Sequence, residues 1–295
     1  MSHVELVQVR TADGLRLDGA LAIPKHADHA VVSRGSNVQH RPPVDAALCV
    51  HGTGSNFYGA TLFEGLTPKL LADGLAVLRV NTRGHDVVSV ASTLHGPRRL
   101  GSALEQVEDC RHDLIAWLEF LASRGFKSVA LIGHSLGAIK ALHTAARIQH
   151  PALARLVAIS PPRLSHSHYL ASEKREEFLT QYRLAQEHVA AGRGDALIER
   201  PLWFLASAAS FIDKYGPDEK YNFLRELNRL HLSTLFAFGG LELQEANFCG
   251  LPEDISAAVS PAQNIQVVTI AGANHIYTGQ IDELAHKIRA WLATN

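Results

Sequence analysis

The feature that most constrains the fold of this chain is an alternation of short, predominantly apolar segments with segments of helical spacing. The apolar segments include "AALCV" at 46–50, "LAVLRV" at 75–80, "KSVALIG" at 127–133 and "LARLVAIS" at 153–160. Strands with no polar face are typical of parallel sheets that helices cover on both sides. The sequence therefore predicts an α/β fold with a mostly parallel sheet.

The two ends of this alternation predict the rest of the core. "VELVQVRT" and "LRLDGALAIP" alternate around the turn "ADG", which indicates an antiparallel hairpin at a sheet edge. Two stretches, 25–44 and 87–102, are expected to be loops, because they are rich in polar residues and breakers. The strand–helix rhythm stops after Pro162 and resumes near residue 231. We therefore expect a core formed by 1–162 and 231–295, with a mostly helical, aromatic-rich cap at 163–230.

Composition excludes several classes of function. About 46% of the residues are hydrophobic and 19% are charged, so the chain can bury a sizeable core. The net charge of -1 gives no electrostatic footprint for nucleic acid or for an anionic membrane. The sequence shows neither an apolar run of membrane-spanning length nor the pattern of a signal peptide. The three scattered cysteines are not a disulfide framework, and a cytoplasmic protein with reduced thiols is expected. Oligomeric state cannot be read from the sequence.

Chemically capable side chains follow the predicted strands at the point where each strand ends. They are His51, Asn81 to Arg83, Ser135, Ser160, Glu242 and His275. Because sites in parallel sheets form outside the carboxyl ends of the strands, we expect these residues to gather at one rim.

Ser135 lies in "GHSLG", between a predicted strand and a predicted helix. A sharp turn there would expose the serine oxygen, and the crowded backbone requires small neighbours such as Gly133 and Gly137. The Leu136 N–H at the helix start would point at the same space. The structural alternative is a glycine-flanked helix start without chemistry.

A serine nucleophile needs a base, and the base needs a carboxylate to orient it. His275, in the loop after the strand "QVVTI", has the position expected of the base. Glu242 and Glu245 both follow the strand "STLFAF", and Glu242 is preferred because it comes earlier in the loop. The preceding strand ends in "ISPPR", which contains no acid.

The glycine-rich turn "HGTG" would supply the second oxyanion donor. We assign the donors to the N–H groups of Leu136 and Thr53, with Gly54 as the alternative to Thr53. His51 and His134 are expected to support loops rather than to take part in catalysis, and Arg83 is expected to be structural.

In the order Ser135, Glu242, His275, with "HGTG", "NTRGH", "GHSLG" and "GANH", the chain resembles the α/β-hydrolase superfamily. The resemblance implies an eight-stranded sheet, no cofactor and a cap inserted after the sixth strand. A glutamate stands where the family more often has aspartate. The cap resembles no subfamily that we can name.

The cap and the "HGTG" turn contain the candidates for substrate contact, which are Trp203, Phe211, Tyr215, Phe57 and Tyr58. The alternative is that the cap aromatics build the cap's own core. His166 and His168 resemble a metal pair, but no third ligand lies near them, so no metal site is expected.

Three hypotheses follow for the function. The first is a serine esterase acting on a small, largely apolar acyl compound. The second keeps the triad but cleaves an amide, a thioester, a lactone or a carbon–carbon bond. The third is a ligand receptor on the same fold, without significant turnover.

Overall fold

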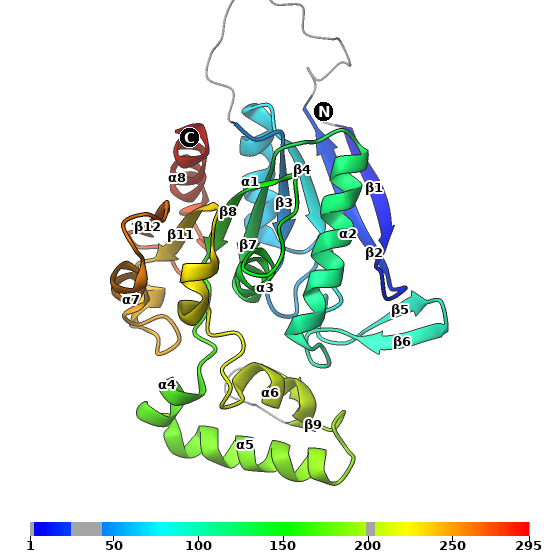
Figure 1. The fold of residues 1–295 in the computed structure, drawn as a ribbon, viewed down its shortest axis with the longest axis vertical. Helices are drawn as coiled ribbons and strands as arrows, with labels where there is room; N and C mark the ends of the chain where they lie inside the picture. Colours follow the sequence, from blue (N-terminus) through cyan, green and yellow to red (C-terminus); the bar gives the residue numbers. More distant parts are fainter. Residues whose placement is uncertain (1–2, 25–42, 199–203, 295) are drawn as a thin grey trace, which may run out of the picture.

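The computed structural model describes residues 3–24, 43–198 and 204–294, and its core is an eight-stranded sheet. The strands lie in the spatial order β1-β2-β4-β3-β7-β8-β11-β12 (Figure 1). Their bounds are β1 His3–Arg10, β2 Arg16–Ile23, β4 Ala76–Val80, β3 Ala46–Val50, β7 Val129–His134, β8 Leu153–Ile159, β11 Ser233–Gly239 and β12 Ile265–Ile270.

The directions of the strands confirm the predicted fold. β1 and β2 form the antiparallel hairpin at one edge, and β2 is also antiparallel to β4. The remaining neighbours, from β4 to β12, pair in parallel. The carboxyl ends of β3, β7, β8 and β11 therefore meet at one rim of the sheet.

Helices cover both faces of the sheet, as the apolar strands require. In β3, Leu48 and Val50 pack in the apolar cluster that contains α2 and α3, whereas Ala47 and Cys49 pack in the cluster that contains α1 and α8. This is the period-two alternation of a strand buried on both faces. The helices are α1 Thr61–Ala72, α2 Cys110–Ser123, α3 Leu136–Ala145, α7 Leu251–Ala258 and α8 Ile281–Ala293.

The segment 87–102, expected to be a loop, instead contains the antiparallel hairpin of β5 (Ser89–Thr93) and β6 (Gly96–Leu100). The residues read as breakers form its turn: Gly96 has a φ of 104°, and Thr93 Oγ1 donates a hydrogen bond to the Gly96 oxygen at 2.7 Å. The prediction of a loop is wrong because the breakers occupy a single turn between two paired strands. The other expected loop, 25–44, lies mostly outside the described residues.

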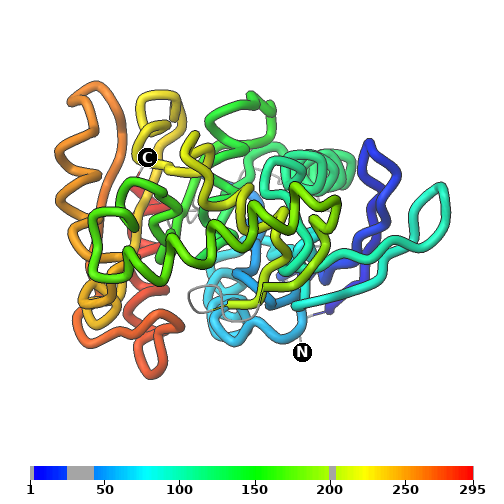
Figure 2. The backbone as a smooth tube through the Cα atoms, turned by 90° about the horizontal axis from the view of Figure 1, so that it is seen from below, coloured from blue at the N-terminus to red at the C-terminus, as the bar shows by residue number. Residues whose placement is uncertain are grey.

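A second layer follows β8 and lies beyond the rim of the sheet. It contains α4 (His166–Ala171), α5 (Arg175–Ala190), β9 (Leu197–Ile198), β10 (Ala206–Ser207), α6 (Ala208–Tyr215) and the 3₁₀ segment η2 (Phe223–Arg229). Figure 1 shows α4, α5 and α6 together at one end of the molecule, and Figure 2 shows this layer running across it. We call α4 to α6 the helical layer. The cap limits, 163 and 230, stay a prediction.

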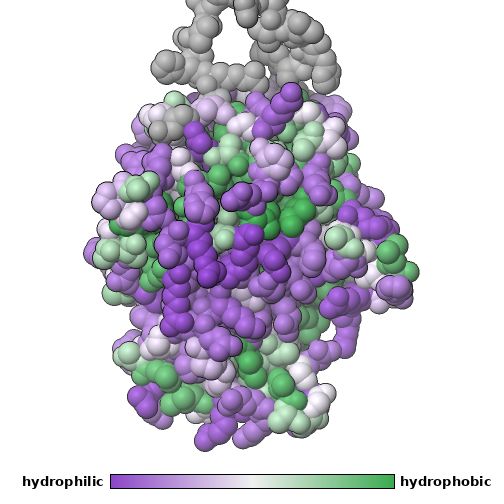
Figure 3. All heavy atoms as spheres, in the orientation of Figure 1, coloured by the Kyte–Doolittle hydropathy of each residue, from purple (hydrophilic) through white to green (hydrophobic). Residues whose placement is uncertain are grey.

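The surface carries small apolar areas among polar ones. The face in Figure 3 is mostly hydrophilic, with green areas near the middle and over the helical layer. No helix within the described residues is long and apolar enough to cross a membrane. Cys49 and Cys110 are buried and Cys249 is exposed, all as free thiols. Burial raises the pKa of each of the two buried thiols to about 12.

Candidate active site

Ser135 occupies the sharp turn between β7 and α3. Its φ of 56° and ψ of -126° are rare for a residue with a side chain and are typical of strained functional turns. A Cβ on Gly133 would lie 2.3 Å from the Gly137 oxygen, and one on Gly137 would lie 2.3 Å from the Val50 oxygen. Neither position has room for a side chain, so both glycines are required for α3 to approach β3 and β7 this closely.

His275 and Glu242 complete a continuous hydrogen-bonded row with Ser135. Ser135 Oγ lies 3.0 Å from His275 Nε2, and His275 Nδ1 lies 2.7 Å from Glu242 Oε2. The carboxylate accepts a hydrogen bond from the Nδ1–H, which keeps the ring proton on Nδ1 and leaves Nε2 free to accept the serine proton. Glu245 is exposed, and the structure places Glu242 rather than Glu245 against the imidazole.

The second oxygen of Glu242 is held by groups that the sequence analysis did not assign. Glu242 Oε1 accepts hydrogen bonds from Ser160 Oγ and from the Gly239 N–H, both at 2.6 Å. Ser160 Oγ in turn lies 3.0 Å from the hydroxyl of Tyr277, which donates to the Ala237 oxygen. The position of Ser160 after a strand was a usable signal, whereas nothing in the sequence singled out Tyr277.

Two rings contact the imidazole of His275. The ring of His134 lies 4.9 Å from it and that of Phe248 lies 5.1 Å from it, both measured between centroids. His134 Nε2 is 2.8 Å from the His275 backbone oxygen, and burial lowers the pKa of His134 to about 3. A neutral His134 therefore donates to that oxygen and supports the loop, in agreement with its expected role.

The "HGTG" turn lies directly beside the serine, because β3 and β7 are neighbours in the sheet. A Cβ on Gly52 would come within 2.9 Å of Ser135 Cβ. Among the described residues, the hydrogen bonds include none donated by the N–H groups of Thr53 or Leu136. Of these two residues, Thr53 is among those that line the cleft beside Ser135.

A cleft of about 270 Å³ opens at Ser135 and His275. It combines apolar and hydroxyl-bearing walls. Its lining residues are Gly52, Thr53, Ser55, Gly59, Ala60, Thr61, Leu62, His134, Ser135, His275 and Ile276.

Among the described residues predicted to contact substrate, namely Phe57, Tyr58, Phe211 and Tyr215, none lines this cleft. Phe57 and Tyr58 pair edge to face, and Tyr58 is exposed. Phe211 and Tyr215 are fully buried among the rings of the helical layer, so they build its core instead. The presence of an aromatic residue in the sequence does not show whether its ring contacts substrate or packs in the core of the helical layer. Trp203 lies outside the described residues.

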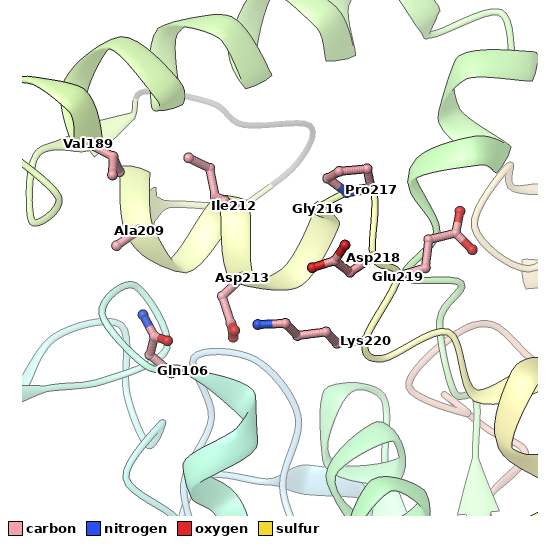
Figure 4. Close-up of a pocket in the computed structure, with 10 residues that line it drawn as sticks. All are labelled: Gln106, Val189, Ala209, Ile212, Asp213, Gly216, Pro217, Asp218, Glu219 and Lys220. Atoms are coloured by element: carbon pink, nitrogen blue, oxygen red, sulfur yellow. The ribbon is translucent and has the colours of Figure 1, made fainter.

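A second cleft of about 260 Å³ lies apart from Ser135, between the helical layer and the start of α2 (Figure 4). Asp213 and Lys220 lie close to each other on one side of it. Asp213 already accepts hydrogen bonds from the Val107 N–H and the Tyr221 hydroxyl. The carboxylate of Asp213 in this second cleft therefore joins α6 to the core residues just before α2.

Arg83 and the histidine pair His166 and His168 have structural partners. Arg83 is buried and forms ion pairs with Asp113, Asp13 and Asp109. His166 and His168 bond to backbone oxygens of Tyr215 and Ala246. Within the described parts of the chain, no group of three histidine, cysteine or acidic residues could hold a metal ion.

The comparisons with known proteins agree with the fold. A family model described as "Alpha/beta hydrolase family" matches residues 47–292. A search of curated protein sequences found no match.

Solved structures with the same fold cover nearly the whole chain. An esterase from Pyrococcus furiosus matches with a TM-score of 0.62 and 17% identity over 99% of this chain and 90% of its own. Est1E from Butyrivibrio proteoclasticus with bound ferulic acid matches with a TM-score of 0.65 and 14% identity, over 97% and 98%. The α/β hydrolase GrgF from a Penicillium species matches with a TM-score of 0.68 and 13% identity, over 98% of each chain.

Proposed function

The chain belongs to the alpha/beta hydrolase family, and we propose that it is a serine hydrolase that cleaves a small, largely apolar carboxylic ester. The observation that carries the proposal is the row Ser135–His275–Glu242, with contacts of 3.0 and 2.7 Å. The esterases among the structural neighbours support the same reaction class.

The proposed reaction assigns a role to each of these groups. Ser135 Oγ attacks the ester carbonyl while His275 Nε2 takes the hydroxyl proton, and Glu242 stabilises the imidazolium. The N–H groups of Leu136 and Thr53 stabilise the oxyanion of the tetrahedral intermediate. His275 then protonates the leaving alcohol, which leaves an acyl-serine.

Water completes the cycle. His275 takes a proton from the water that attacks the acyl carbon, and the oxyanion forms again. When the bond between the acyl carbon and Ser135 Oγ breaks, His275 returns this proton to Ser135 Oγ and the acid is released. Every proton passes through the same nitrogen, so the reaction needs no second base.

The walls of the cleft limit the substrate. Its volume of about 270 Å³ lies at the lower end of ligand sites in proteins. Ala60, Leu62 and Ile276 offer apolar contact, while Thr53, Ser55 and Thr61 carry hydroxyl groups. These features favour a short acyl or alcohol group over a long chain.

Hydrolysis of nitrophenyl esters of increasing acyl length, measured beside nitroanilides of the same acids, tests the proposal. We expect the highest kcat/KM for acyl groups of about four carbons or fewer and negligible anilide cleavage. Anilide cleavage without ester cleavage would favour an amidase. A ligand that binds the parent protein and Ser135→Ala equally, without turnover by the parent, would favour a receptor.

A further inference from the structure

Three charged side chains are buried beside the candidate site, and the proposed reaction uses none of them. Lys140 from α3 lies 2.6 Å from Glu105 Oε2, and Lys214 from α6 lies 3.5 Å from Glu105 Oε1. Their side chains are between 0 and 2% exposed. Burying ionised groups is costly and rarely adds net stability, so a cluster of this kind calls for another explanation.

Lys140 also contacts the end of strand β4. Its ammonium donates a hydrogen bond to Thr82 Oγ1 at 3.0 Å. An ammonium can only donate, so the threonine oxygen accepts, and its own proton can go to His51 Nε2, which lies 3.4 Å away. The Thr82 N–H also points at this nitrogen, at 3.3 Å.

These donors fix the protonation of His51. Burial and, secondarily, the charge of Lys140 lower the pKa of His51 to about 3, so the ring is neutral near pH 7. Because Nε2 accepts, the single ring proton is on Nδ1. Nδ1 then donates to the Gly52 oxygen at 2.8 Å.

The Gly52 oxygen and the Thr53 N–H belong to one peptide unit. In a planar trans peptide these two groups point in opposite directions. Holding the Gly52 oxygen on the His51 side therefore turns the Thr53 N–H away from His51. Gly52 adjoins Ser135, and Thr53 lines the cleft.

We propose that Lys140 is a positioning residue for the oxyanion site: acting through Thr82 and His51, it sets the orientation of the Gly52–Thr53 peptide. Glu105 holds the ammonium in place, and Lys214 ties Glu105 to the helical layer. The inference rests on the proposed function, because it assigns a purpose to the Thr53 N–H that only an oxyanion intermediate would use.

The most direct variant, Lys140→Met, would leave Glu105 with a single partner in the interior and is expected to fold poorly. Thr82→Val is the sharper test, because valine keeps the volume and removes only the hydroxyl. Thr82→Ser restores the hydroxyl. Thr144→Val is the matched control, since Thr144 is also fully buried, on the same helix as Lys140, and outside the relay.

For hydrolysis of a nitrophenyl ester, we expect kcat of Thr82→Val to fall about tenfold or more, with KM within about twofold of the parent. Thr82→Ser and Thr144→Val should keep kcat within about twofold. A kcat for Thr82→Val equal to that of Thr144→Val would overturn the inference. If the parent itself neither hydrolyses esters nor reacts at Ser135, the proposed function fails, and the inference fails with it.

Nitrogen NMR of labelled histidine gives a readout that does not need turnover. We expect His51 in the parent to show a single neutral tautomer protonated at Nδ1 between pH 5 and pH 8. In Thr82→Val the share of the other tautomer should rise. An unchanged tautomer in Thr82→Val, or a parent protonated at Nε2, would also overturn the relay.

Discussion

At the scale of single residues, the candidate site depends on a carboxylate that is held from three directions. Glu242 bonds to His275 through one oxygen and to Ser160 and the Gly239 N–H through the other. Its side chain is fully buried, so each of its acceptor positions needs a donor. The ring of His275 is thereby given both an orientation and a tautomer.

Substitutions at Glu242 and Glu245 should show which of the two glutamates orients His275. Glu242→Gln keeps the size but offers an N–H where the imidazole needs an acceptor, so kcat should fall by about 10²- to 10⁴-fold. Glu245→Gln, whose side chain is exposed, should keep kcat within about twofold. Steady-state kinetics on one short ester suffices, and equal losses in both variants would argue against the assignment.

At the scale of elements, the site exists because a strand, a turn and a helix meet without side chains between them. α3 begins immediately after Ser135, and Gly137 in its first turn lies against the backbone of β3. The Ser135 N–H also donates to the Ile159 oxygen, which ties the turn to β8. The serine is thus held at the rim by three adjacent strands.

A methyl group at Gly137 should disrupt this junction. Its Cβ would lie 2.3 Å from the Val50 oxygen and 2.4 Å from the His51 oxygen, so α3 or the "HGTG" turn must move. We expect Gly137→Ala to lower the free energy of unfolding by about 3 kcal/mol or more and to abolish turnover. Gly194→Ala is the control, since its Cβ would meet only Ala209 at 3.4 Å. Thermal unfolding of both variants checks this, and a Gly137→Ala as stable as Gly194→Ala would contradict it.

The elements that could be predicted from sequence are those whose own residues form an apolar run or show a regular spacing. Apolar strands and the loops after them predicted the sheet and the rim that brings Ser135, Glu242 and His275 together. Substrate contacts could not be predicted in this way, because burial of Phe211 and Tyr215 depends on ring packing between helices. The buried cluster around Glu105 was also missed, since its members lie in three separate segments.

At the scale of the whole molecule, polar contacts connect the start of α4 to the segment after α6, and α6 to the core. Glu219 accepts hydrogen bonds from Ser165 Oγ, the Ser167 N–H and Asn222 Nδ2. Lys214 of α6 donates to the Ser102 oxygen of the core. Backbone and neutral groups also join α4 and its neighbours to the core, since His168 Nε2 bonds to the Ala246 oxygen and the Ser207 N–H donates to the Ala103 oxygen.

These contacts should make the protein sensitive to acid. Hydrogen bonds from serines and Asn222 outweigh burial and lower the pKa of Glu219 to about 2, from an ordinary value of 4.5. Because the unfolded chain binds this proton more readily, the stabilisation is full above about pH 4.5 and is lost as the pH falls toward 2. We expect it to amount to about 2 kcal/mol, less than the full linkage value because Glu219, although buried, lines the second cleft.

Urea unfolding of the parent and of Glu219→Gln from pH 2.5 to pH 7 measures how much the Glu219 carboxylate contributes to the free energy of unfolding. The variant should be less stable than the parent at pH 7, and the difference should shrink toward low pH. Glu187→Gln, an exposed substitution on α5, is the control and should follow the parent. A constant difference between parent and Glu219→Gln at every pH would assign its effect to packing instead.

The central claim is that Ser135 is an activated nucleophile, and labelling with a fluorophosphonate followed by peptide mass spectrometry tests it most directly. The account predicts a phosphonyl adduct on Ser135 of the native protein, none on heat-denatured protein, and none at all in Ser135→Ala. Equal labelling of the parent and Ser135→Ala, or an adduct only on another residue, would contradict it.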